Sequence, residues 1–111
     1  PAATVESVER TRAQAKRVIA VGTSVVRALE GRALAGHGVL TPGAGETTLR
    51  LGLGYRPQLV HGLLSGMHEP AESHYALLQA FAPRALLERA QASAQAWGYL
   101  GHEFGDATLI V

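Results

Sequence analysis

Cysteine is absent from the 111 residues, and methionine, lysine and aromatic residues are scarce. Without cysteine the chain has no disulfide, no thiol chemistry and no thiolate zinc site, and its redox compartment stays open. No apolar run approaches the roughly 18 residues that a membrane span needs, and no signal peptide is visible. We therefore expect a cytoplasmic protein that does not enter a membrane.

Charge is also sparse, at 17% of residues against 47% hydrophobic ones. A core is therefore possible, and intrinsic disorder is not expected. The formal net charge of +1 falls short of the dense basic face of a stand-alone nucleic-acid module. Lys16 is the single lysine among ten cations, and the arginines suit recognition of phosphate or carboxylate. A genome rich in Ala, Gly and Arg codons would give the same bias.

The chain begins with Pro1, and its only methionine is Met67. Its length suits one domain or part of one. We expect a single α/β segment over residues 1–111 that belongs to a larger enzyme.

Hydrophobic spacing in the first part of the chain predicts alternating helices and strands. An exposed helix is expected over residues 4–15 with Thr4 as its N-cap. The β-branched run 17–21 predicts a buried strand, and a tight turn at Gly22 leads into a helix over residues 25–35.

The second part continues in the same way after a Gly-rich loop. Alternating leucines predict a strand over residues 47–55, and a short apolar run predicts another over 59–67. Helical spacing marks residues 72–81 and 84–97, and a last strand is expected over 107–111. These elements predict an α/β fold with a layered, largely parallel sheet flanked by helices.

The helix over residues 84–97 has the clearest boundaries, with Pro83 at its first turn and Gly98 as C-cap. One apolar stripe is expected to be buried. The stripe consists of Leu86, Leu87, Ala90, Ala94 and Trp97.

Common nucleotide-binding and hydrolase motifs are missing: G-x-G-x-x-G, G-x-x-x-x-G-K-[ST] and G-x-S-x-G. The stretch SGMHEPAESH, residues 65–74, crowds ionisable side chains around a proline. It is not H-E-x-x-H, because Glu72 stands where the second histidine belongs. A metal cage of His61, His68 and His74 is one interpretation, and an exposed polar turn is the favoured one.

The turn Gly22-Thr23-Ser24 presents backbone N–H groups and two hydroxyls at the start of a helix. Such a turn suits a carboxylate or a phosphate, and it also suits an ordinary Ser/Thr helix cap. Arg27 and Glu30 lie three residues apart on that helix. They either form an ion pair with each other, or Arg27 reaches a ligand anion.

Gly105-Asp106 directly precedes the last predicted strand. Asp after Gly is typical of a turn. A carboxylate at the edge of a sheet is also a hydrogen-bond acceptor for a ribose or a base, and both interpretations stay open.

Four blocks in this order resemble one enzyme family: RVIAVGTSVVRALE, GETTLRLGLGY, SGMHEPAES and GYLGHEFGDATLIV. They resemble the C-terminal part of the S-adenosylmethionine:tRNA ribosyltransferase-isomerases of queuosine biosynthesis. The resemblance implies a longer enzyme whose N-terminal strands and inserted β-barrel domain are absent from these residues.

The implied activity is transfer and isomerisation of the ribosyl group of S-adenosylmethionine. The acceptor is 7-aminomethyl-7-deazaguanine in tRNA, and the products are epoxyqueuosine-tRNA, adenine and methionine. The resemblance calls for S-adenosylmethionine as ribosyl-donor substrate, for tRNA as partner, and for neither a metal nor a permanently bound cofactor.

The resemblance also suggests site residues, at positions that match the family motifs. We predict His68 as the acid/base residue, because an imidazole titrates near neutral pH. Gly22, Thr23 and Arg27 are predicted to hold an anion, and Asp106 to bind a ribose or a base. The predicted substrate-binding residues are Gly22, Thr23, Ser24, Arg27, Glu30, Ser73, Gly105 and Asp106.

The third block departs from the family pattern at Glu69 and Glu72, and so does His74, which directly follows the quoted residues. These changes describe a divergent member and leave two alternatives open. The first is an enzyme of the same fold that acts on a different, non-tRNA acceptor. The second is a non-catalytic fragment or dimerisation module, for which a homo-oligomer of such pieces is an open question.

Overall fold

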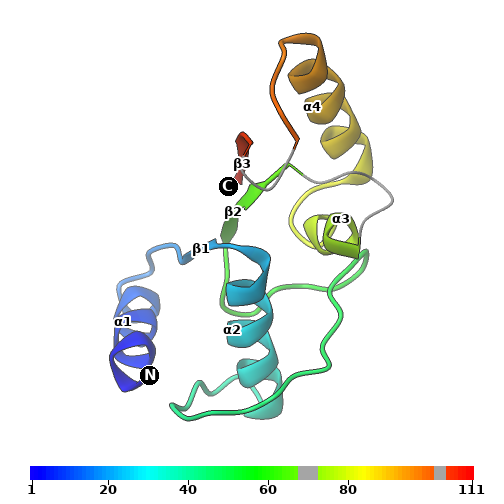
Figure 1. The fold of residues 1–111 in the computed structure, drawn as a ribbon. Coiled ribbons are helices and arrows are strands. Elements are labelled where there is room, and N and C mark those ends of the chain that lie inside the picture. Colours follow the sequence, from blue (N-terminus) through cyan, green and yellow to red (C-terminus); the bar gives the residue numbers. More distant parts are fainter. Residues whose placement is uncertain (68–72, 102–104) are drawn as a thin grey trace.

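Helices and strands alternate along the chain as far as α3, which is followed by a further helix, in a computed structural model that describes residues 1–67, 73–101 and 105–111 (Figure 1). The elements are α1 (Ala2–Ala13), β1 (Ile19–Val21), α2 (Thr23–Ala35), β2 (Gly62–Gly66), α3 (Ser73–Leu78), α4 (Arg84–Ala96) and β3 (Ala107–Ile110). Helices α1 and α2 lie towards one end of the elongated molecule, and α4 lies at the other end. The predicted α/β class is confirmed.

The sheet has β2 in its centre, with β1 on one side and β3 on the other. Strands β1 and β2 are parallel, with Ile19 opposite Gly62. Strands β2 and β3 are antiparallel, with Gly66 opposite Ala107. The expectation of a largely parallel sheet is therefore corrected: among the described residues the sheet is mixed. Helix α2 supplies the crossover that a parallel pair requires, and it packs on β1 and β2.

One face of α2 is buried because its residues recur at helical spacing. Val26, Glu30 and Ala33 are all fully buried, at positions i, i+4 and i+7. Leu59 and Leu63 complete this part of the core. Burying side chains of this size stabilises a fold by about 1.5–3 kcal/mol each.

The strand expected over residues 47–55 is wrong, because this segment is irregular. It runs from α2, where Thr47 meets Gly31, to α3, where Gly52 faces Ala76. No described strand lies alongside it, so its backbone has no ladder to join. Its leucines therefore do not share one buried face: Leu51 is buried and Leu53 is 82% exposed.

Three further expectations at the sheet edge and the helix starts need correction. Helix α1 begins at Ala2, so Thr4 lies inside its first turn and is not the N-cap. Strand β1 was expected to be buried, yet Ile19 is 38% and Val21 is 66% exposed. Strand β1 has a single described neighbour, which leaves one edge open. Helix α4 begins at Arg84 as expected, but Pro83 is its N-cap residue and does not belong to its first turn.

The apolar stripe of α4 is only partly buried. Of its members Leu87 lies in the core, whereas Leu86 is 52% and Trp97 is 77% exposed. The reason is that α4 does not close on the sheet. A cavity of about 310 Å³ separates Ala94 and its neighbours from β3.

Candidate functional site

The carboxyl ends of β1 and β2 meet at one edge of the sheet because these strands are parallel. Strand β3 runs the other way and so begins at this same edge. Gly22 follows β1, Met67 follows β2, and Gly105 and Asp106 precede β3. With strands about 4.8 Å apart, these three chain segments lie within roughly 10 Å of one another across the edge. We name this place the carboxyl edge.

Two other predicted residues belong to the same part of the chain. His68 follows Met67 directly but lies outside the described residues, as do Glu69 and Glu72. Ser73 is the first residue of α3.

The first amides of α2, which follow the turn after β1, have no hydrogen-bond acceptor within the helix. Gly22 is the N-cap residue, with φ 97° and ψ 145°, and it adopts a conformation that favours glycine. Its N–H donates to the Leu64 carbonyl at 2.8 Å, which ties the turn to β2. The helical hydrogen bonds begin at Val26 N, so the amides of Thr23 and Ser24 precede them. The alternative of a Ser/Thr N-cap is wrong, because both residues already belong to the helix.

Asp106 closes the loop before β3. Its carboxylate accepts a hydrogen bond from Leu100 N at 2.8 Å, and its own N–H donates to Leu100 O at 2.9 Å. The turn interpretation therefore describes what Asp106 does in this structure. Only Oδ2 takes part in these bonds, and Oδ1 bonds none of the described residues.

Glu30 is fully buried, and its own chain saturates its carboxylate. Oε1 accepts hydrogen bonds from Leu59 N at 2.8 Å and Val60 N at 2.9 Å. Oε2 accepts from Gln58 N at 2.8 Å and from the Tyr55 hydroxyl at 3.1 Å. The helix thereby fixes the segment that leads into β2. The alternative of an ion pair with Arg27 is not realised among the described residues.

The same contact changes the acidity of Tyr55. Burial, followed by the charge of Glu30 and their hydrogen bond, raises the pKa of Tyr55 to about 12. The phenol therefore keeps its proton at neutral pH and remains a donor to Glu30.

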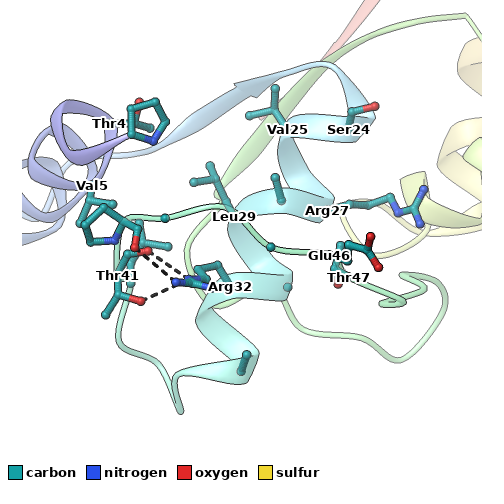
Figure 2. A pocket seen from close by; sticks show the side chains of 18 residues that line it. Thr4, Val5, Ser24, Val25, Arg27, Leu29, Arg32, Thr41, Glu46 and Thr47 are labelled. Atoms are coloured by element: carbon teal, nitrogen blue, oxygen red, sulfur yellow. Dashed lines mark hydrogen bonds between the residues drawn. The ribbon is translucent and has the colours of Figure 1, made fainter.

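A cavity of about 490 Å³ lies beside α2 (Figure 2), and Glu30 is not among its lining residues. Two predicted residues, Ser24 and Arg27, line it, together with residues of α1 and of the segment 40–47. Its volume falls within the range of small-molecule sites, which is about 300–1,000 Å³. The structure thus separates the predicted residues: Gly22 and Asp106 lie at the carboxyl edge, Ser24 and Arg27 face this cavity, and Glu30 faces the core.

Segment 41–47 forms the far wall of the cavity and is held by Arg32. The Arg32 Nε donates to Thr41 O at 3.1 Å and Thr41 Oγ1 at 3.2 Å, and Nη2 donates to Pro42 O at 3.3 Å. The segment then crosses α2 at Gly31. A Cβ at Gly31 would lie 2.8 Å from the Thr47 Cβ, so only glycine fits this crossing.

Three residues of these sites were not singled out from the sequence: Tyr55, Arg32 and Glu46. Glu46 is the second residue of the block GETTLRLGLGY, which carried the family resemblance, so a signal for it existed. Tyr55 and Arg32 contact partners that are distant in sequence, and no local pattern marks them.

The metal cage considered for His61, His68 and His74 includes His68, which lies outside the described residues. His61 Nδ1 accepts a hydrogen bond from Val18 N at 3.0 Å, which joins β1 to β2. Among the described residues no three His, Cys, Asp or Glu side chains are placed to hold a metal ion. Nor does any described helix have the length and apolar character to cross a membrane.

The chain is similar to proteins of one family along nearly its whole length. Residues 1–110 match the family model described as queuosine biosynthesis protein. The S-adenosylmethionine:tRNA ribosyltransferase-isomerase of Synechococcus elongatus is 45% identical over 111 residues, which is 100% of this chain and 30% of that protein. The protein of the same name from Nostoc is 43% identical, over 100% of this chain and 28% of that protein.

A solved structure agrees with these similarities. The crystal structure of an S-adenosylmethionine tRNA ribosyltransferase from Thermotoga maritima matches with a TM-score of 0.86 and 32% identity. The match covers 100% of this chain and 39% of that one. The chain thus spans well under half the length of the proteins it resembles and forms part of their α/β fold. The chain belongs to the family of queuosine biosynthesis proteins.

Proposed function

We propose that this chain supplies the S-adenosylmethionine-binding part of a tRNA ribosyltransferase-isomerase. The names of its relatives support this substrate and this partner. The observation that carries the proposal is the carboxyl edge, where the segments matching three family motifs come together. Ligands of open α/β sheets bind outside the carboxyl ends of their strands.

The proposed reaction moves the ribosyl group of S-adenosylmethionine onto 7-aminomethyl-7-deazaguanine in tRNA. Adenine and methionine leave, and epoxyqueuosine-tRNA is formed. We place the reaction in the cytoplasm, where tRNA is modified. The apolar cavity between α4 and β3 borders Met67 and Ala107, so a planar base has an apolar surface beside the carboxyl edge.

His68 is proposed as the acid/base residue, because its chain neighbour Met67 follows β2 at this edge. The free amides of Thr23 and Ser24 offer hydrogen bonds to an anion at a helix start. Asp106 Oδ1 is available to a ribose or base hydroxyl or amine. Ser73 and Gly105 remain proposed neighbours of the substrate.

Glu30 is proposed to hold the segment before β2 and not to bind substrate. It has no exposed surface, and four donors already occupy its oxygens. Its effect on the site is indirect, since it fixes the start of the strand whose other end leads to His68.

The test is a chimera in which this chain replaces the matching region of the Synechococcus elongatus enzyme. The chimera is incubated with S-adenosylmethionine and tRNA that carries the deazaguanine precursor, and adenine and the modified nucleoside are quantified. We expect adenine release that depends on tRNA. A folded chimera that releases no adenine contradicts the proposal, because that result is expected of a non-catalytic module. Adenine release without tRNA would show a different acceptor.

His68→Ala in the chimera is expected to lower turnover by about 10²–10⁴-fold, the usual contribution of an acid/base residue. Affinity for S-adenosylmethionine should stay close to that of the unmodified chimera. His37→Ala is the matched control, because His37 is exposed and lies away from the carboxyl edge. Equal turnover of the two variants would remove His68 from the mechanism.

A further inference from the structure

One stripe of α2 faces the cavity of about 490 Å³ with a charged group between small residues. Ser24, Arg27, Ala28 and Gly31 all line it, at positions i, i+3, i+4 and i+7 of the helix. Residues at this spacing share one helix face. Arg27 is the charged member of this stripe, and its neighbours Ala28 and Gly31 are small.

A carboxylate faces this stripe. Thr47 abuts Gly31, which lies one helical turn after Arg27, and Figure 2 shows Glu46 and Arg27 on the same side of the cavity. Glu46 is exposed and Arg27 is half-buried, and neither bonds any described residue. Among the described side chains that line the cavity, Arg27 therefore provides a cation and Glu46 an anion, each without a partner there.

The second arginine of the cavity is not available in this way. The Arg32 guanidinium is turned towards Thr41 and bonds that segment, while Arg27 and Glu46 extend to the other side in Figure 2. Arg32 shapes the wall of the cavity, and the charge left for a ligand is that of Arg27.

We propose that this cavity binds the amino-acid end of S-adenosylmethionine. The Arg27 guanidinium binds the α-carboxylate, a pairing for which its planar donor geometry is suited. The Glu46 carboxylate binds the α-ammonium group. The hydroxyls of Ser24 and Thr47 stand beside these groups, and Ala28 leaves room for the methylene chain. This inference rests on the proposed function, since it takes S-adenosylmethionine as the substrate.

The position of the cavity agrees with the chemistry at the carboxyl edge. Ser24 lies in the first turn of α2, two residues after Gly22. A ligand whose amino-acid end contacts Arg27 therefore extends past Ser24 towards the edge where ribosyl transfer is proposed. A site that provides both a cation and an anion suits a zwitterion better than it suits a phosphate, for which Glu46 would be repulsive.

The test is calorimetric titration of the chain with S-adenosylmethionine and with decarboxylated S-adenosylmethionine, which lacks only the carboxylate. Arg27→Gln should weaken binding of S-adenosylmethionine about tenfold or more, as expected when a charged hydrogen-bond partner is lost. It should leave binding of the decarboxylated compound within about twofold of the unmodified chain. Glu46→Gln should weaken binding of both, because both carry the ammonium group.

Arg50→Gln is the matched control, because Arg50 is exposed and does not line the cavity. Circular dichroism melting of each variant separates lost binding from lost folding. If the folded chain does not bind S-adenosylmethionine, or if Arg27→Gln weakens both ligands equally, the inference is overturned. If binding follows the expected pattern but the chimera releases no adenine, the proposed binding site is supported and the proposed reaction is refuted.

Discussion

The two faces of α2 each carry a charged residue, and the hydrogen bonding of these two residues is opposite. On the inner face Glu30 is fully buried, and four donors from its own chain saturate it. On the outer face Arg27, three residues earlier, lines a cavity and bonds no described residue. Both residues matched the same sequence block and were predicted to bind substrate. The difference teaches that a matched charged residue is available to a ligand only where the fold leaves its hydrogen-bonding groups free.

Removing the inner charge should have the largest effect on stability. Glu30→Ala leaves the buried amides of Leu59 and Val60 without an acceptor. At about 1–3 kcal/mol for each, together with the space left behind, we expect a loss of about 3–5 kcal/mol. Urea unfolding followed by circular dichroism measures it.

Glu46→Ala is the control for that loss, because Glu46 is an exposed carboxylate on the outer side. Its effect on the free energy of unfolding should stay within about 0.5 kcal/mol. Equal losses for the two glutamates would remove the distinction between the faces.

The crossing of segment 41–47 over α2 gives the next largest effect. Gly31→Ala places a methyl group against Thr47, and overpacking of this kind costs about 1–3 kcal/mol. Thermal unfolding should show the loss, and Thr47→Gly in the same chain should recover much of it. A Gly31→Ala chain more stable than the unmodified one would show that the segment does not press on the helix.

Tyr55→Phe tests a single bond to Glu30 and should cost about 1 kcal/mol at neutral pH. The pKa of Tyr55 is raised to about 12 in the folded chain, from the ordinary value of 10.0. Its contribution to stability is therefore complete below pH 10 and is lost as the pH rises towards 12.

Unfolding measured at several pH values separates this contribution from the rest. The difference between the unmodified chain and the Phe variant should shrink above pH 10 as the phenol ionises. A difference that grows over this range contradicts the contact with Glu30.

Arg27→Gln should have the smallest effect on stability, within about 0.5 kcal/mol, because no described partner is lost. The same chemical unfolding assay measures it. A loss as large as that of Glu30→Ala would mean that Arg27 is part of the folded framework and not a free binding group.

Local patterns predicted much of this fold because they report which face of an element is apolar. Strands β2 and β3 and helices α3 and α4 form within the ranges expected from spacing, and α2 begins two residues before its expected start. The strand over 47–55 failed because alternation describes side chains, whereas a strand also needs a neighbour for its backbone. The exposure of Trp97 likewise depends on what packs against α4, which no local window contains.

Short motifs marked Gly22, Arg27 and Asp106 as candidates, because glycine turns and isolated charges are visible in a sequence. The arrangement of these residues in the fold was not visible there. The donors to Glu30 lie 25 to 30 residues further along the chain, so nothing near Glu30 shows that its carboxylate is saturated. The same holds for Arg32 and the segment it fixes.

The most direct test of the two faces is amide hydrogen exchange of the chain with and without S-adenosylmethionine. In the free chain, the amides of Leu59 and Val60 should exchange only through global unfolding. Their exchange rates should therefore report the free energy of unfolding. Added ligand should slow exchange in the segment around Glu46 and Thr47 beyond that general stabilisation. The account is contradicted if the amides bound by Glu30 exchange rapidly in the free chain and become protected only with ligand, since Glu30 would then belong to the binding site.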